Sequence, residues 1–149
     1  MEEEWRRCVF HAVLTTAFEH ELFLEGEGSV LFDEGFAQRF FTLRGNGEMG
    51  REGDAERYAE AMPRPSGLVW ISADSETCLE RLGRRPRMPI LLEGETKEVR
   101  SRRLTRGNEM LGALVYSAER RGIPALRIDC GESAESAGRK VADFVEGLR

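Results

Sequence analysis

Two adjacent carboxylates follow an apolar run in the N-terminal third of the sequence. Residues 29–40 read SVLFDEGFAQRF, so Asp33 and Glu34 come directly after Val-Leu-Phe. Carboxylate oxygens are typical ligands of Mg²⁺, and ligands of parallel sheets collect at the carboxyl ends of the strands. The pattern indicates a metal or phosphate site if the run is a buried strand. The alternative is a polar strand end that caps a helix beginning at residue 36.

Basic residues, most of them arginines, form a second group of side chains that could bind a ligand. Residues 81–106 carry nine basic side chains and only three glutamates, although the whole chain has a net charge of -5. A basic segment in an acidic protein indicates an anionic ligand rather than a nucleic-acid track. The alternatives are a solvated basic loop around Pro86 and the polar face of a following helix. The basic residues are Arg81, Arg84, Arg85, Arg87, Lys97, Arg100, Arg102, Arg103 and Arg106.

Composition narrows the class of protein. The 149 residues, 40% of them apolar, suffice for one domain with a hydrophobic core. Cys8, Cys78 and Cys130 have no C-x-x-C spacing, which argues against a disulfide framework or a zinc site and favours the reducing cytoplasm. No stretch has the length and apolarity of a membrane span, so neither a membrane nor nucleic acid is an expected partner.

The elements that must position these side chains follow from periodicity and turn signals. Asp54 is the expected cap of the helix that begins there, and Gly122 is expected to end the long helix before it. We expect helices over 2–24, 36–43, 54–62, 75–82, 95–121 and from Ser133 onward, and strands over 29–33, 68–72 and 124–129.

Short apolar strands separated by helical crossovers predict an α/β fold, with a parallel sheet of about three strands covered by helices. Three acids, Asp33, Asp74 and Asp129, would then lie at the same carboxyl edge of that sheet. Asp129 is also expected to orient the loop that follows it. Trp70, inside a strand, is expected to be a core residue rather than a stacking platform for a ligand.

Three segments in this order resemble P-loop nucleoside and nucleotide kinases of the thymidylate kinase type. SVLFDEGFAQRF resembles their Walker B region, and GLVWISADSETCLERLGRRPR resembles the next strand and the helix leading to an arginine-rich lid. GIPALRIDCGESAESAGRKVADFVEGL resembles their last strand and helix. The resemblance covers roughly residues 25–149 and implies an incomplete P-loop kinase-like three-layer fold, within one domain over 1–149.

The resemblance implies ATP and Mg²⁺ as cofactors and phosphoryl transfer to a small acceptor. It places Asp33 at the metal and, with Glu34, Arg81 and Arg85, in the catalytic set. It places Arg39 and Tyr58 at the acceptor. Arg84 and Arg87 would bind the nucleotide phosphates, and Gly131, Glu132 and Ser133 would border the purine. It further implies a basic lid over 83–94, while glycines and low apolar content predict, independently of the resemblance, a flexible loop and short helix over 44–67.

The sequence departs from that family in one respect. It contains no G-x-x-x-x-G-K-[ST] motif, whose backbone N–H groups and lysine cradle the phosphates. The chain resembles the C-terminal two-thirds of such a kinase and is expected to be inactive alone, as a truncated or degenerate relative. The alternatives are a non-catalytic nucleotide-binding or protein-interaction domain, or a structural partner, including a homo-oligomer, that completes its sheet with another chain.

In that family the strand carrying the phosphate cradle lies between the two strands matching 29–33 and 68–72. Without it, we expect those strands to pair directly, with Leu31 beside Val69, because unpaired buried amides are costly. The N-terminal helix, with Trp5, Val9 and Val13, would then lie across one face of the closed sheet. The alternative is a strand added by another chain.

Overall fold

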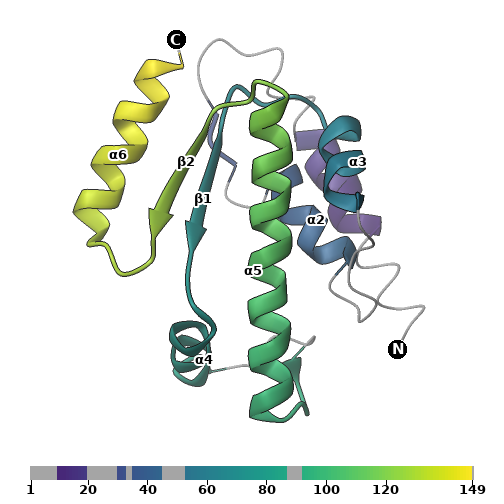
Figure 1. Cartoon of the computed structure of the whole chain (residues 1–149), viewed down its shortest axis with the longest axis vertical. Coiled ribbons are helices and arrows are strands. Elements are labelled where there is room, and N and C mark those ends of the chain that lie inside the picture. The colour runs from purple at the N-terminus through teal and green to yellow at the C-terminus, as the bar shows by residue number, and fades with distance from the viewer. Residues whose placement is uncertain (1–9, 20–29, 33–34, 45–52, 87–91, 149) are drawn as a thin grey trace.

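The structure is a computed structural model that describes residues 10–19, 30–32, 35–44, 53–86 and 92–148 (Figure 1). Residues 10–19 are helical. The further elements are α2 (Phe36–Arg44), α3 (Asp54–Ala61), β1 (Leu68–Ser72), α4 (Ser75–Gly83), α5 (Lys97–Arg120), β2 (Ala125–Asp129) and α6 (Ala134–Gly147). The protein is therefore a mixed α/β chain in which helices outnumber strands.

β1 and β2 form a parallel pair, as the sequence predicts. Their register runs from Leu68 opposite Ala125 to Ser72 opposite Asp129. The Cys130 N–H donates to the Ser72 carbonyl oxygen at 2.9 Å, so the pairing continues one residue past β2. The crossover between the strands consists of α4 and α5 (Figure 1).

Helices pack on both sides of this sheet (Figure 1). Trp70 lies against α5 so closely that a Cβ on Gly112 would be 3.0 Å from the indole Cη2 atom. On the other side, a Cβ on Gly67 would lie 2.9 Å from the Phe144 ring of α6. Because side chains alternate along a strand, the even-numbered residues of β1 face α5 and the odd-numbered ones face the side of α6.

The core lies mainly between α5 and the two short helices before β1. Leu114 and Ala118 of α5 are fully buried. Leu114 packs with Phe40 of α2 and Ala59 of α3, and the Phe40 and Tyr58 rings lie 4.9 Å apart between centroids. α5 is therefore the element on which both the sheet and the helices before it pack.

The helix ends agree with the sequence signals except at α3. Asp74, Thr96 and Ser133 cap α4, α5 and α6 with their side-chain oxygens. The predicted Asp54 cap is wrong. Gly53, at φ 83°, is the N-cap residue, and Asp54 is the first helical residue, buried and bonded to Arg57 at 2.5 Å. Glycine suits this position because its φ is positive.

The predicted third strand is wrong over the residues that the structure describes. Residues 30–32 belong to no strand, and Val30 and Leu31 are 47% and 71% exposed. The predicted pairing of Leu31 with Val69 is wrong too, because residues 30–32 belong to no strand and the sheet of the described residues consists of β1 and β2. An apolar run indicates β propensity, but a strand also needs a neighbour whose backbone it can pair with, and the run itself does not specify one.

The N-terminal helix contacts α2 through a polar bond. Thr16 is 1% exposed, and its hydroxyl accepts a hydrogen bond from Arg39 Nε at 3.0 Å. Val13, expected on the face toward the sheet, is half-buried, whereas the apolar side chains of Phe10, Leu14 and Phe18 are 65%, 51% and 65% exposed. Trp5 and Val9, predicted on the sheet-facing side, lie outside the described residues.

Candidate functional site

The carboxyl ends of β1 and β2 lie side by side, and the chain turns there into α4 and α6 (Figure 1). We call this region the carboxyl edge and define it as residues 73–81 and 129–136. Two of the three acids predicted there, Asp74 and Asp129, belong to it. The third, Asp33, and its neighbour Glu34 lie outside the described residues.

Asp74 is held as the cap of α4. Its carboxylate accepts hydrogen bonds from the Thr77 N–H at 2.8 Å and from the Thr77 hydroxyl at 2.7 Å. These bonds favour the ionised form and hold the pKa of Asp74 below its usual range, the backbone bond contributing most. The carboxylate is therefore negatively charged at neutral pH, with both oxygens already engaged by Thr77.

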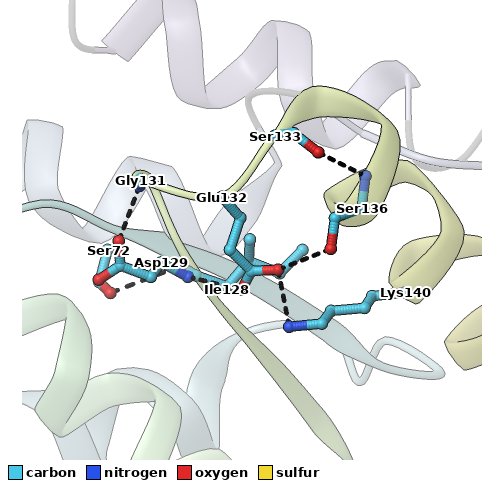
Figure 2. A network of polar contacts seen from close by, with 8 residues as sticks. All are labelled: Ser72, Ile128, Asp129, Gly131, Glu132, Ser133, Ser136 and Lys140. Atoms are coloured by element: carbon cyan, nitrogen blue, oxygen red, sulfur yellow. Dashed lines mark hydrogen bonds and ion pairs between the residues drawn. The ribbon is translucent and has the colours of Figure 1, made fainter.

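The loop after β2 is organised by Asp129, as predicted (Figure 2). Asp129 Oδ1 accepts the Gly131 N–H at 2.7 Å, and the Asp129 carbonyl accepts the Glu132 N–H at 3.0 Å. A Cβ at Gly131 would lie 2.9 Å from Asp129 Oδ1. This close approach explains why a glycine occupies the turn.

Glu132 and Ser133 join this loop to α6 (Figure 2). The Glu132 carboxylate bonds Lys140 Nζ at 2.7 Å and accepts a bond from the Ser136 hydroxyl at 3.2 Å. Lys140 is the main cause of the lowered pKa of Glu132. Ser133 accepts the Ser136 N–H at 3.2 Å. The three residues predicted to border a purine thus form one contiguous turn at the carboxyl edge.

Arg81 is the arginine of the predicted set that reaches this turn. Its Nη2 atom donates to the Cys130 carbonyl oxygen at 3.0 Å and so connects α4 to the end of β2. Arg84 instead forms an exposed pair with Glu80 at 2.5 Å, four residues earlier on the same helix. Arg85 is exposed just after α4, and Arg87 lies outside the described residues.

Arg39 and Tyr58, the predicted acceptor-binding residues, both make contacts within the helical part of the fold. The Tyr58 hydroxyl donates to the Phe36 carbonyl oxygen at 2.8 Å, and its ring packs on Phe40. Burial raises the pKa of Tyr58, while the nearby charge of Arg39 opposes that effect. Arg39 is bonded to Thr16, so both side chains have a structural role here.

Sequence reasoning missed three residues at this edge. Thr77 completes the Asp74 cap, and a threonine three residues after a capping acid is a recognisable local signal. Lys140, in α6, forms an ion pair with Glu132 in the loop before that helix. No local sequence signal predicts this pair. Cys130 lies between Arg81 and Ser72 only because two distant strands pair.

The arrangement is suited to holding an anion. The N-termini of α4 and α6 both lie at the carboxyl edge, where their dipoles favour negative charge. Arg81, from the last turn of α4, adds a positively charged side chain beside the Cys130 carbonyl at the end of β2. Within the described ranges, no group of three or more histidine, cysteine, aspartate or glutamate side chains could hold a metal ion.

Comparisons with known proteins give no match: no family model fits the chain, and no curated protein or solved structure is significantly similar to it. Of the helices that the structure describes, none has both the length and the apolarity to span a membrane.

Proposed function

We propose that this chain is a P-loop kinase-like nucleotide-binding domain that binds nucleotide phosphates at its carboxyl edge and does not turn over ATP alone. The parent chemistry would be Mg²⁺- and ATP-dependent phosphoryl transfer to a small acceptor. One observation carries the proposal: Arg81, in the last turn of α4, donates to the Cys130 carbonyl oxygen at the start of the loop that leads into α6. A guanidinium group is therefore held at the carboxyl end of β2, and the helices that follow β1 and β2 begin at this edge of the parallel sheet.

Each part of this edge has a distinct role in the proposal. The first turns of α4 and α6 would offer backbone N–H groups to phosphate oxygens. Arg81 and Arg85 would add guanidinium donors, whose planar forks match phosphate geometry. The turn at Gly131–Ser133 would contact the base through its backbone. Asp33 and Glu34 would serve Mg²⁺ and the acceptor.

Calorimetric titration of the full chain with ATP, with and without Mg²⁺, tests the proposal. Replacing Arg81 and Arg85 together by alanine should weaken binding by about tenfold or more, since each removes a charge-assisted hydrogen bond. The matched control replaces Arg120 and Arg121 at the other end of α5, where they pair with Glu56 and Glu60. Equal loss in both double variants would mean that only net charge matters, and absence of binding to the unmodified chain would refute the proposal.

A second function, protein interaction by strand addition, is favoured by the side of β1 that faces away from β2, with which no strand of the described residues pairs. Leu68 donates toward β2 and Ser72 accepts from it, so Val69 and Ile71 direct their N–H and C=O groups to the opposite side. In the described part of the chain the sheet has only two strands, and no strand pairs with that side. Ile71 is also 62% exposed. An uncharged edge strand of this kind is open to pairing with another chain.

The strand-addition function predicts self-association or partner binding that depends on Ile71. Ile71→Lys should lower the mass measured by light scattering if the unmodified chain is oligomeric, because a charge at an edge opposes pairing. Tyr116→Lys is the matched control, since Tyr116 is equally exposed, at 61%, but lies on α5. A monomeric unmodified chain, or equal effects of both variants, would count against self-association through β1.

A further inference from the structure

Two of the three cysteines lie at the carboxyl edge, on elements that are distant in sequence. Cys130 directly follows β2, and its N–H donates to the Ser72 carbonyl oxygen at 2.9 Å, so it sits against the end of β1. Cys78 lies in the first turn of α4, where its N–H donates to the Asp74 carbonyl oxygen at 3.0 Å. Both are free and partly exposed, so a small oxidant can reach them.

The face of α4 that carries Cys78 is turned toward Cys130. Residues three apart on a helix share a face, and Arg81, three residues after Cys78, donates to the Cys130 carbonyl oxygen at 3.0 Å. Electrostatics agrees with this placement. Burial contributes most to raising the pKa of the Cys78 thiol, the charges of Cys130 and Asp74 add to the rise, and Arg81 opposes it.

We propose that Cys78 and Cys130 form a redox modification site in which a small disulfide such as glutathione disulfide closes an intramolecular disulfide. One cysteine thiolate attacks glutathione disulfide, giving a mixed disulfide and releasing one glutathione. The second thiolate attacks the protein sulfur of that mixed disulfide and releases the second glutathione. Two protein thiols are oxidised to one disulfide while one glutathione disulfide is reduced to two thiols.

The bond would link the same two elements that Arg81 joins. In the reduced protein α4 is connected to the end of β2 by the Arg81–Cys130 hydrogen bond, which is reversible and exposed to water. In the oxidised protein a covalent bond would fix α4 against the turn at Gly131–Ser133. The site therefore responds to the redox state of its surroundings without depending on whether a nucleotide binds there.

Peptide mapping of the unmodified full chain tests the proposal directly. Trypsin places the three cysteines in separate peptides, because it cleaves after arginine or lysine but not before proline. These are residues 8–39, 58–81 and 128–139. After incubation with glutathione disulfide at mildly alkaline pH and blocking of free thiols, we expect peptide 58–81 linked to peptide 128–139 in non-reduced digests and separated by dithiothreitol. Peptide 8–39 should carry a blocked thiol or a glutathione adduct.

Two controls make the result specific. Cys78→Ser and Cys130→Ser should each stop at a glutathione adduct on the remaining cysteine of the pair, and the link between peptides 58–81 and 128–139 that the unmodified chain forms should be absent. In denaturant the unmodified chain should yield the 58–81 to 128–139 link at least about tenfold less, since the fold no longer holds the thiols together. The proposal is overturned if the folded chain keeps both thiols, stops at two glutathione adducts, or links Cys8 as often.

Discussion

At the scale of single residues, the acidic side chains of the carboxyl edge already form hydrogen bonds or ion pairs with nearby residues. Asp74 is bonded to Thr77, Asp129 to Gly131, and Glu132 to Lys140. The first two bonds hold a backbone N–H group where a strand leads into a helix, and the third joins the loop after β2 to α6. These acids therefore shape the edge first, and a ligand would meet a preorganised set of backbone groups rather than free carboxylates.

The Asp74 cap gives a pH-dependent contribution to stability with a definite sign. The folded pKa lies below the ordinary value of 3.8, so the contribution is complete above that value and is lost as pH falls through the lower, folded pKa. Thermal unfolding should show Asp74→Ala less stable than the unmodified chain at pH 7, with a smaller difference in strong acid. Asp74→Asn is the control, because asparagine also caps helices but does not titrate. A constant difference for Asp74→Ala at every pH would contradict the assignment.

Ser133 allows the same capping contribution to be measured without a titrating group. Its hydroxyl accepts the Ser136 N–H at the start of α6. Ser133→Ala should lower the free energy of unfolding by about 1 kcal/mol in urea titrations, and Ser133→Asp should restore most of it. If both variants match the unmodified chain, the Ser133 hydroxyl does not cap α6 in solution.

At the scale of elements, α5 holds the chain together. Its fully buried Leu114 packs between α2 and α3. Leu114→Ala should destabilise the protein by about 2 to 5 kcal/mol, from lost burial and the cavity that remains. Tyr116→Ala, two residues away but 61% exposed, should change stability by less than about 0.5 kcal/mol. Similar losses of stability in both variants would mean that α5 does not bury Leu114 against α2 and α3 while leaving Tyr116 exposed.

The docking of α6 on the sheet depends on the absence of a side chain at Gly67. A Cβ there would lie 2.8 Å from Leu148 Cδ1 and 2.9 Å from the Phe144 ring. Gly67→Ala should cost about 1 to 3 kcal/mol by overpacking. Gly138→Ala is the matched control inside α6, where nothing lies within 4 Å, and it should stabilise by up to about 1 kcal/mol. The two glycine-to-alanine changes should therefore have opposite signs in denaturant unfolding.

At the scale of the whole molecule, a two-stranded parallel sheet and its helices present one edge with groups suited to anions. The chain contains no G-x-x-x-x-G-K-[ST] motif, and arginines with carboxylates do not position a transferring phosphoryl group without such a cradle. We therefore expect no appreciable ATPase or kinase turnover from the chain alone in a coupled phosphate-release assay. Turnover at an ordinary kinase rate that Asp33→Ala abolishes would contradict this, and phosphates would then have to bind elsewhere, for example near Gly45–Gly47.

The sequence by itself determined the elements whose signals are local. β1 and β2, the caps at Asp74 and Ser133, and the extent of α5 follow from short apolar runs, capping residues and helical spacing, because these features act within a few residues of the chain. The parallel direction of β1 and β2 could also be predicted from the sequence, because two strands joined by a long helical crossover usually run parallel in a sheet. Even the orientation of the loop by Asp129 was predictable from its position at a strand end.

Only the tertiary structure decided which distant groups meet. The run at Val30–Phe32 has the composition of a strand, yet residues 30–32 belong to no strand, because strand formation depends on a neighbour elsewhere in the chain. The resemblance placed Arg39 and Tyr58 at an acceptor, and the structure adds what the sequence could not show, that Arg39 donates to Thr16 and Tyr58 to the Phe36 carbonyl oxygen. Cys130 lies against the end of β1 only because β1 pairs with β2. The chemistry of each side chain can be read from the sequence residue by residue, whereas the distances between side chains depend on how the whole fold packs.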